Sequence, residues 1–323
     1  MSRRIRVPFL VDLVLVSAPG DIREAGADRR LDRPLMRRGP LINRWLAGRF
    51  SRSLRVPAGP LPSARGRDDP ERIAINRALF TRLSAAPDPV IAALSADIAE
   101  AARFVAGKRD GDIGPVAQAL FAKPFKPAFR ANARTIGAAR TIAGALSSFN
   151  PLTLLANGLT GRVGRAQKEL AAALDNDPSA VHSAAIAVHN LVDSLIAMRA
   201  LYAQGGAASI PAEAAASRAL FGPPRVIRQA ERLTEARIGT LNENALILLS
   251  TRDANAKGAD DRIAFLSETW SACPAGSFVV ALLEAIWRKA VASAPNAAAN
   301  PAPTRPEPAE ATAPPATAQA LEA

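Results

Sequence analysis

The sequence has few of the residues from which common sites are built. A single cysteine, Cys273, occurs in 323 residues, which excludes an internal disulfide and a cysteine-rich zinc site. Only two histidines are present, His182 and His189, so metal sites built from several histidines are excluded as well. The chain also lacks a glycine-rich phosphate loop, a G-x-S-x-G turn and an H-E-x-x-H motif. One unpaired cysteine is typical of a reducing compartment, and we expect a cytoplasmic protein.

The chain is poor in aromatic residues and rich in small apolar ones. Aromatics make up 5% of it, while hydrophobic residues reach 49% and are mostly Ala and Leu. These two residues have high helix propensities, so the composition predicts a mainly α-helical fold with a small β component. We expect residues 1–292 to form a single domain. Residues 293–323 are mostly Ala, Pro, Thr and Glu without apolar periodicity, and we expect a disordered tail there.

Long uninterrupted apolar runs are missing. Pro8 and Asp12 break the apolar stretch near the N-terminus, and no segment approaches the roughly 18–20 apolar residues of a membrane span. We therefore expect no membrane-spanning helix. The alternating residues of VDLVLVS instead predict a β-strand at about 8–17.

Acidic residues are scarce in the N-terminal part, which concentrates positive charge there. Residues 1–66 carry 14 Arg and five acidic residues, a net charge of +9, while the whole chain has +12. A basic segment favours an anionic partner: nucleic acid, an acidic protein or anionic lipid. No nucleic-acid recognition motif accompanies the charge, so we do not expect a nucleic-acid partner. The Arg, Pro and Gly content predicts that 1–69 is partly irregular, above all at 28–69.

Most of the remaining chain is predicted to be helical. Asp68-Asp69-Pro70-Glu71 has a proline near the first helical position and acids in the first turn, which indicates a helix start. A run of Ile and Leu predicts a buried strand at 245–251, and 252–272 has no clear period. The predicted helices cover 21–27, 70–84, 88–106, 114–122, 130–147, 151–158, 163–174, 178–203, 211–221 and 276–292.

The C-terminal third contains an ordered series of motifs. In chain order these are the helix at 211–221, Pro223-Pro224, a strand with Arg228, Ser250-Thr251-Arg252-Asp253, and a Cys273 loop that leads into the helix at 276–292. In order and approximate spacing this segment resembles the end of the haem-thiolate monooxygenases, the cytochrome P450 family. Two earlier segments, VLVSAPGDIREA and PERIAINRALFTRLS, are similar to the family's first strand and helix and to its propionate-binding helix. The resemblance implies a shortened P450-like fold.

Cys273 is the residue on which the implied chemistry depends. The resemblance implies that Cys273 ligates the iron of haem b. A thiolate is the form of cysteine that binds metals, and the helix after Cys273-Pro274 places a positive dipole end near the sulfur. A thiolate on haem iron donates electron density and favours cleavage of the O–O bond. Trp270, three residues earlier, is expected to pack on the porphyrin. The alternative is a cysteine that is simply a small buried apolar residue.

Three arginines are expected to pair with the haem propionates. Arg228 stands where the family has a propionate-binding arginine, a few residues past Pro223-Pro224. Arg72 occupies the position of the histidine in the family's Pro-Glu-His, and Arg77 matches the second arginine of that helix. A guanidinium binds a carboxylate through two parallel hydrogen bonds. The alternative for each arginine is a solvated surface charge.

The chain departs from the family pattern at several positions. Ala215 stands where the family has the glutamate of its Glu-x-x-Arg pair, which ends here at Arg218. A salt bridge that normally fixes the core near the haem is therefore missing or rearranged. Asn76 replaces the first arginine of the propionate-binding helix. Three usual residues of the cysteine loop are replaced by Thr269, Ser271 and Ala275.

The helix AAIAVHNLVDSL lacks the family's usual acid–alcohol pair at the best-matching positions, where Asn190 and Leu191 stand. Asn190 cannot transfer protons as a carboxylate does, and Leu191 has no hydroxyl. His189 is a candidate acid–base group or distal ligand, so we take His189 and Asn190 as catalytic candidates. His182 lies seven residues earlier, on the same face of a regular helix. The alternative is that local hydrogen bonds satisfy both histidines.

Three functions are compatible with this sequence. The first is a haem-thiolate oxidoreductase, a monooxygenase or peroxygenase that acts on a hydrophobic substrate and has a redox partner protein among its expected partners. The missing acid–alcohol pair favours peroxide, which arrives with its own electrons and protons. The second is a catalytically degenerate P450-like scaffold that binds a partner or lipid. The third is an anion-binding helical protein without haem. The resemblance favours the first.

Overall fold

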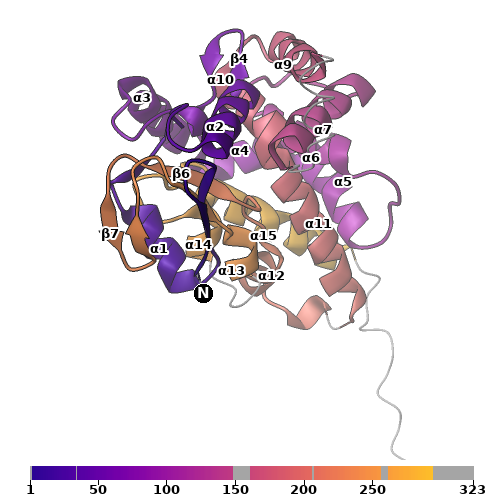
Figure 1. Cartoon of the computed structure of the whole chain (residues 1–323). Coiled ribbons are helices and arrows are strands. Elements are labelled where there is room, and N and C mark those ends of the chain that lie inside the picture. The colour runs from indigo at the N-terminus through magenta and orange to yellow at the C-terminus, as the bar shows by residue number, and fades with distance from the viewer. Residues whose placement is uncertain (1, 34, 148–160, 206, 256–260, 294–323) are drawn as a thin grey trace, which may run out of the picture. The chain divides into compact units, whose positions relative to one another are not determined.

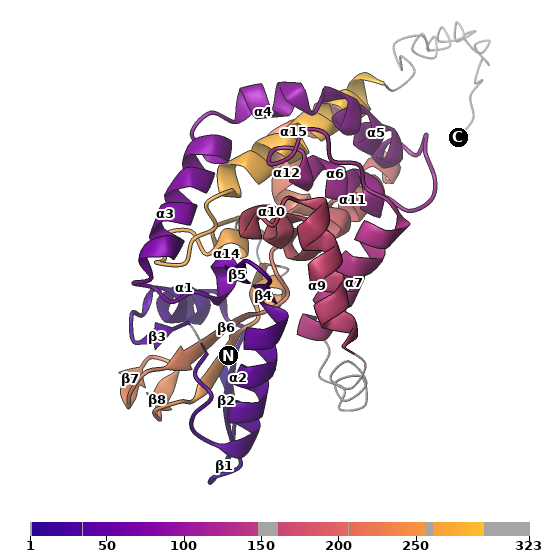
Figure 2. The same cartoon turned by 90° about the horizontal axis from the view of Figure 1, so that it is seen from above.

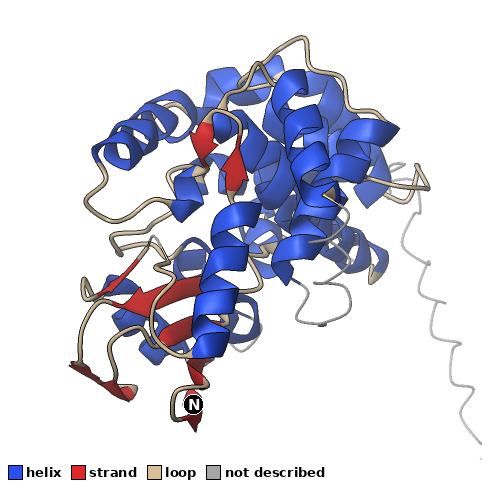
Figure 3. Cartoon of the chain, turned by 45° about the horizontal axis from the view of Figure 1, so that its top comes forward, coloured by secondary structure: helices blue, strands red, loops and turns tan. Residues whose placement is uncertain are grey.

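The described residues form a small sheet covered and flanked by helices (Figure 1, Figure 3). The structure is a computed structural model, and it describes residues 2–33, 35–147, 161–205, 207–255 and 261–293. Met1–Ser293 make up one compact unit. The predicted helix at 151–158 and residues 294–323 of the predicted disordered tail lie outside the described residues.

A five-stranded mixed sheet joins the N-terminal and C-terminal parts of the unit. Its order is β1-β2-β9-β6-β3, in which β2 and β9 are parallel and the other neighbours are antiparallel. All four residues of β9 are buried, whereas every residue of the edge strand β1 is exposed. The strands are β1 Ser2–Val7, β2 Val11–Val16, β3 Leu31–Asp32, β6 Val226–Ala230 and β9 Leu246–Leu249. Two small hairpins consist of β4 Arg55–Val56 with β5 Gly59–Pro60, and of β7 Thr234–Ala236 with β8 Gly239–Leu241.

Helices make up the larger part of the unit. Two of them contain a π-helical turn, at Phe80–Ser84 and at Ser183–Ala187, and short 3₁₀ turns cover Pro62–Ala64 and Ala207–Ser209. The α-helices are α1 Pro19–Ala27, α2 Leu41–Ser53, α3 Pro70–Leu79, α4 Pro87–Ala93, α5 Ser95–Val105, α6 Gly114–Ala122, α7 Ala133–Ser147, α9 Arg162–Ala173, α10 Pro178–His182, α11 Val188–Ala203, α12 Ala212–Ala219, α13 Thr251–Asn255, α14 Asp261–Phe265 and α15 Gly276–Ala292.

The main hydrophobic core lies between α5, α6, α11, α12 and α15. Leu283, Ile286 and Trp287 of α15 are at most 1% exposed, and the Trp287 indole N–H donates to the Ile210 carbonyl at 3.1 Å. Small residues of the facing helices, among them Ala101 and Ala216, let α15 approach closely. A second core lies between α7, α9 and α10, and a third between the sheet and α1, α13 and α14.

One continuous helical segment, Pro178–Ala203, runs through the helical part and combines α10, the π turn and α11. It is the one segment among the described residues that is long and apolar enough to cross a membrane by length and composition alone. In this fold Leu191, Leu195 and Met198 are at most 1% exposed and pack in the main core. Its apolar character is therefore explained by contacts with α5, α6 and α12.

The predicted helices agree with the structure over most of the chain. The segments at 114–122, 178–203 and 276–292 are confirmed with the same bounds. The predicted strand at 8–17 is shorter and is preceded by β1, with a turn at 8–10 between the two strands.

The prediction of irregular structure at 28–69 is wrong for α2, a helix of 13 residues. Its start has no side-chain cap and no acid in the first turn, so the usual local signals are missing. Leu46 and Phe50 lie four residues apart on its buried face, and both are at most 5% exposed. Packing of this face against Leu246 of the sheet stabilises a helix that the local sequence does not predict.

A buried asparagine connects α2 to the sheet. The Asn43 side chain is 0% exposed, and its amide N–H groups donate to the carbonyls of Asp12 at 2.7 Å and Asn244 at 3.0 Å. Its carbonyl oxygen accepts from the Asp12 backbone N–H at 3.2 Å. One side chain thus satisfies backbone groups of two segments at once.

We expect Asn43→Ala to lower the free energy of unfolding by about 2 kcal/mol, because it leaves buried backbone groups without partners. Urea unfolding of the full chain measures the change. Lys168→Ala, on the exposed side of α9, is the matched control and should leave the free energy of unfolding within about 0.5 kcal/mol of the wild-type value. Equal midpoints for Asn43→Ala and the control would contradict the structural role of Asn43.

Candidate functional site

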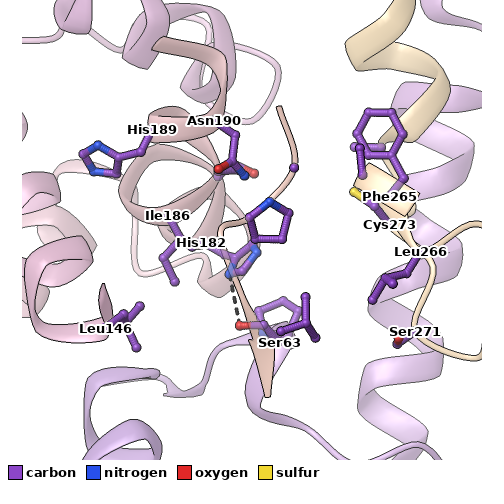
Figure 4. Close-up of a pocket in the computed structure, with 18 of the residues that line it drawn as sticks. Ser63, Leu146, His182, Ile186, His189, Asn190, Phe265, Leu266, Ser271 and Cys273 are labelled. Atoms are coloured by element: carbon purple, nitrogen blue, oxygen red, sulfur yellow. Dashed lines mark hydrogen bonds between the residues drawn. The ribbon is translucent and has the colours of Figure 1, made fainter. Parts of the chain in front are cut away.

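A cavity of about 890 Å³ lies between the Pro178–Ala203 segment, α3 and the loop before α15. Figure 4 shows its two sides, with His182, Ile186 and Asn190 on one and Phe265 and Cys273 on the other. Its volume is in the range of small-molecule and cofactor sites. Most of its lining is apolar, including Leu79, Leu83, Phe121, Phe125, Phe278 and Val279.

Cys273 lies deep in the fold, yet its side chain is exposed because it faces this cavity. α15 begins at Gly276, so the sulfur lies near the positive end of a helix dipole, as predicted from the sequence. The Cys273 backbone N–H donates to the Phe265 carbonyl at 2.9 Å, which fixes the loop. Burial raises the pKa of the thiol, and a hydrogen bond from the Ala275 backbone N–H opposes this effect. The thiol is therefore neutral until a cation beside it stabilises the thiolate.

A π turn lies between the two histidines of the long helix and changes the directions of their rings relative to each other. In a regular helix, residues seven apart lie on one face, but a π turn inserts one residue and rotates the following segment by about 100°. His182 faces the cavity, and its Nδ1 lies 3.3 Å from the Ser63 hydroxyl. His189 points away from Cys273 toward α7, where its Nε2 lies 3.3 Å from the Ala139 carbonyl oxygen (Figure 4). Both histidines line the cavity, but their rings point in different directions.

The environment of both histidines disfavours their charged forms. Burial and the nearby Arg33 lower the pKa of His182 to about 4. Burial also lowers the pKa of His189, against the raising effect of its hydrogen bond to Ala139. Both rings are therefore neutral near pH 7 and act as hydrogen-bonding groups rather than as cations.

Three arginines converge on the indole of Trp270. The guanidinium carbons of Arg228, Arg72 and Arg33 lie 4.7, 4.8 and 5.7 Å from the ring centre. Arg72 donates to the Trp270 carbonyl at 2.9 Å, and Arg33 donates to the Ser63 carbonyl at 2.5 Å. The partners of these guanidinium groups are thus mostly backbone carbonyls and the π face of the indole. We call Arg33, Arg72, Arg228 and Trp270 the arginine–tryptophan cluster.

The positive charge of this cluster is not balanced by acids. Burial and repulsion from Arg72 lower the pKa of Arg33 to about 10. Burial, with repulsion from Arg33 and Arg72, lowers the pKa of Arg228, and burial lowers that of Arg72 against the raising effects of Asp32 and Asp69. Asp32 is the acid that acts on all three. Among the described residues, the buried Nε atoms of Arg33 and Arg228 and the indole N–H of Trp270 have no hydrogen-bond partner. Such uncompensated charge is typical of a site that binds an anion.

The structure places two of the five predicted cofactor residues, Arg72 and Cys273, in the cavity wall. Arg228 is 0% exposed and lies behind the wall, where it donates to the hydroxyl of Ser271, a lining residue. Trp270 contacts the arginines and is not among the residues that line the cavity, and Arg77 lies on the exposed side of α3.

Sequence reasoning missed three residues of the cavity wall. Arg33 follows β3 in a segment that was predicted to be irregular, and nothing in its local sequence distinguishes it from the neighbouring arginines. Asp193 and Ser194 form a consecutive acid and alcohol on α11, and both line the cavity. The consecutive acid and alcohol in the sequence could have identified Asp193 and Ser194 as candidate site residues. Asp193 pairs with Arg252 at 2.7 Å, and the Ser194 hydroxyl accepts from the Phe221 backbone N–H at 3.0 Å.

The Glu-x-x-Arg position contains no buried salt bridge. Ala215 is 0% exposed in the main core, and Arg218 lies on the exposed face of α12. Close packing of alanines against α15 takes the place of an ion pair here. Within the part of the chain that the structure describes, no group of three or more His, Cys, Asp or Glu side chains is placed to bind a metal ion.

The comparisons with known proteins are informative at the level of structure. No protein-family model matches the chain, and no curated protein matches its sequence. The solved structures that resemble it include P450BioI in complex with an acyl carrier protein ligated to hexadec-9Z-enoic acid, with a TM-score of 0.56 and 12% identity over 88% of this chain and 86% of that one. A mutant of P450 EryK in complex with erythromycin B has a TM-score of 0.55 and 12% identity, over 90% of this chain and 84% of that one.

A third similar structure is the tirandamycin C-bound P450 monooxygenase TamI, with a TM-score of 0.54 and 15% identity over 90% of this chain and 85% of that one. At 12% to 15% identity, this likeness is one of fold. The fold is that of the cytochromes P450 in a shortened form, mainly α with a small β component, as the sequence predicted.

We expect the ring of His182 to titrate near pH 4, well below the value of about 6.5 for an unperturbed histidine. Because the unfolded chain binds this proton first, the free energy of unfolding should fall as the pH falls from about 6.5 to 4. NMR titration measures the shift directly, since the chain has only two histidines and His189→Gln assigns their signals. His182→Gln should weaken the loss of stability in acid. A His182 midpoint near 6.5 would contradict the burial described here.

Proposed function

We propose that this chain is a haem-thiolate oxidoreductase that oxidises a hydrophobic substrate. The observation that carries the proposal is the position of Cys273, whose sulfur faces the cavity from the start of α15, opposite the long helix. The P450-like fold supports it, because this fold class places a haem between these two elements. Fold alone does not imply function, so the argument rests on the residues of the site.

The residues around the cavity fit haem b at both of its chemically distinct parts. Cys273 would ligate the iron, and the Ala275 N–H would hydrogen-bond the sulfur. Arg33 and Arg72, the members of the arginine–tryptophan cluster that line the cavity, would pair with the two propionates, and the unpartnered Nε–H of Arg33 is available as a donor. When bound, a thiolate-ligated haem supplies the electron-rich iron that favours cleavage of an O–O bond.

Peroxide is the oxidant that this cavity favours. Asn190 offers no transferable proton, and the carboxylate of Asp193 is paired with Arg252. A peroxide brings its own electrons and protons: one oxygen is inserted into a substrate C–H bond to give an alcohol, and the other leaves as water or, from an alkyl peroxide, as an alcohol. The substrate carbon is oxidised, and the peroxide O–O bond is reduced and broken. No electron donor is required in this reaction.

The chain's own residues set the conditions for the substrate. The apolar lining of the cavity binds a hydrophobic molecule and excludes water from the reacting carbon. Neutral His182, bonded to Ser63, offers a polar contact without a charge. One of the similar structures is bound to an acyl carrier protein, and the basic N-terminal part of this chain is compatible with an acidic carrier protein as partner.

A second function is favoured by one specific observation. Without a Glu–Arg pair at Ala215 and Arg218, the core lacks an interaction that the P450 family uses next to the haem. The alternative is thus a degenerate P450-like scaffold that binds a partner without turnover. A chain that binds no haem cannot be the oxidoreductase, but a scaffold could still bind haem. Peroxide-driven oxidation of a substrate is expected only of the oxidoreductase and so distinguishes the two functions fully.

We expect the full chain, expressed with a haem precursor, to show the long-wavelength Soret band of thiolate-ligated iron in its reduced carbon-monoxide difference spectrum. Cys273→Ala should abolish that band, because no other described thiol faces the cavity. His189→Gln, which changes a ring directed away from Cys273, should retain it. A folded wild-type protein with no Soret band would overturn the proposal in favour of the scaffold.

We expect Arg33→Met to have opposite effects in the presence and absence of haem. Without haem it should raise the free energy of unfolding by about 1 kcal/mol, because one of three repelling buried charges is removed. With haem it should speed the loss of the cofactor to an apomyoglobin acceptor, since one propionate partner is gone. Arg77→Met, an exposed change on α3, is the control for both measurements. Haem loss from Arg33→Met that is no faster than from the wild type would rule out a propionate role for Arg33.

A further inference from the structure

Exposed apolar side chains are concentrated near the N-terminus. Of the 12 large hydrophobic residues that are exposed among the described residues, eight lie at positions 5–45. Scattered exposed residues are ordinary, whereas a contiguous group indicates a binding surface. The eight are Ile5, Val7, Phe9, Leu10, Met36, Leu41, Ile42 and Trp45.

Backbone hydrogen bonds bring five of these residues together. The Leu41 N–H donates to the Phe9 carbonyl at 2.9 Å, and the Ile42 N–H donates to the Leu10 carbonyl at 2.8 Å. Trp45 lies one helical turn after Leu41 on the same side of α2. We call these five residues the hairpin–helix patch. Figure 2 shows the β1–β2 hairpin and α2 side by side at one end of the described unit.

Phe9 is the most exposed member of the patch. Its side chain is 93% exposed, and its φ angle of 62° lies in the left-handed region, which is unfavourable for a bulky residue. The turn that keeps it there is closed by a hydrogen bond from the Leu10 N–H to the Val7 carbonyl at 3.1 Å. A strained turn that presents an aromatic ring to water indicates that the ring is buried against something else.

Basic residues outnumber acidic ones in the segments that carry the patch. Residues 33–67 contain nine Arg and no acidic residue, and β1 adds three more Arg. Arg6, Arg38 and Arg44 are exposed, and within the described ranges none of the three forms an ion pair. The nearby exposed acid is Glu243, next to Asn244, which touches Gly39. The partner that binds this surface must therefore have both apolar and anionic groups.

We propose that the hairpin–helix patch docks on the surface of an anionic lipid bilayer. The patch is the projecting tip of a hairpin with the first turn of a helix, a convex shape that can enter the interfacial region of a bilayer. Trp45 and Phe9 would lie at the headgroup level, and the surrounding guanidinium groups would contact lipid phosphates. Docking leaves the cavity residues untouched and is independent of haem.

Flotation of the full-length chain with lipid vesicles tests the proposal. We expect binding to vesicles of phosphatidylcholine mixed with phosphatidylserine, and much weaker binding to phosphatidylcholine alone. Phe9→Asn combined with Trp45→Gln should weaken binding by at least about tenfold. Asparagine tolerates a positive φ, so the turn is preserved. Arg38→Gln and Arg44→Gln should each weaken binding by about fivefold.

Ile73→Gln combined with Arg134→Gln is the matched control, because it removes an exposed apolar residue and an exposed arginine from other faces. This variant should bind like the wild type, and circular dichroism should show all variants folded. Wild-type protein that floats with neither vesicle would overturn the proposal and leave an acidic protein as the partner to test. Binding that is equal for the patch variants and the control would overturn it as well.

Discussion

One end of the cavity is built on three buried guanidinium groups. All three pack on the same indole, and too few acids are nearby to balance their positive charge. Arg33 comes from the segment after β3, Arg72 from α3 and Arg228 from β6, and all three meet at Trp270 in the cysteine loop. Four segments that are distant in sequence are thereby joined at one point. Their positive charges repel one another, so this end of the cavity is held by carbonyls and by packing rather than by ion pairs.

The same charge that destabilises the empty chain prepares it for an anionic group. An uncompensated cationic cluster at one end and a thiol at the start of α15 together define a cavity with two chemically different ends. α2 connects this cavity with the hairpin–helix patch, because its first turn carries the patch and Phe50 and Ser51 near its end line the cavity. Binding at the patch and binding in the cavity therefore involve opposite ends of one helix.

Much of the fold could be predicted from the sequence, because most helices carry their own signals. The helix at 276–292 is strongly apolar and follows Cys273-Pro274, and α3 has a proline and acids in its first turn. α2 could not be predicted, because it lacks a cap and is stabilised by burying Phe50 against the sheet. β1 could not be predicted either, because an exposed edge strand has no apolar side to mark it.

For the site, the sequence by itself determined that Cys273 precedes a helix and that arginines are available near it. The tertiary structure alone decided which arginines meet, since Arg33, Arg72 and Arg228 all contact Trp270 across some 40 to 240 positions of the chain. It also decided the direction of the histidines. Both histidines line the cavity, but the single residue inserted by the π turn at Ser183–Ala187 directs the His182 ring toward Ser63 and the His189 ring toward α7. Such a turn arises from packing between helices, and the sequence period of 3.6 residues does not contain it.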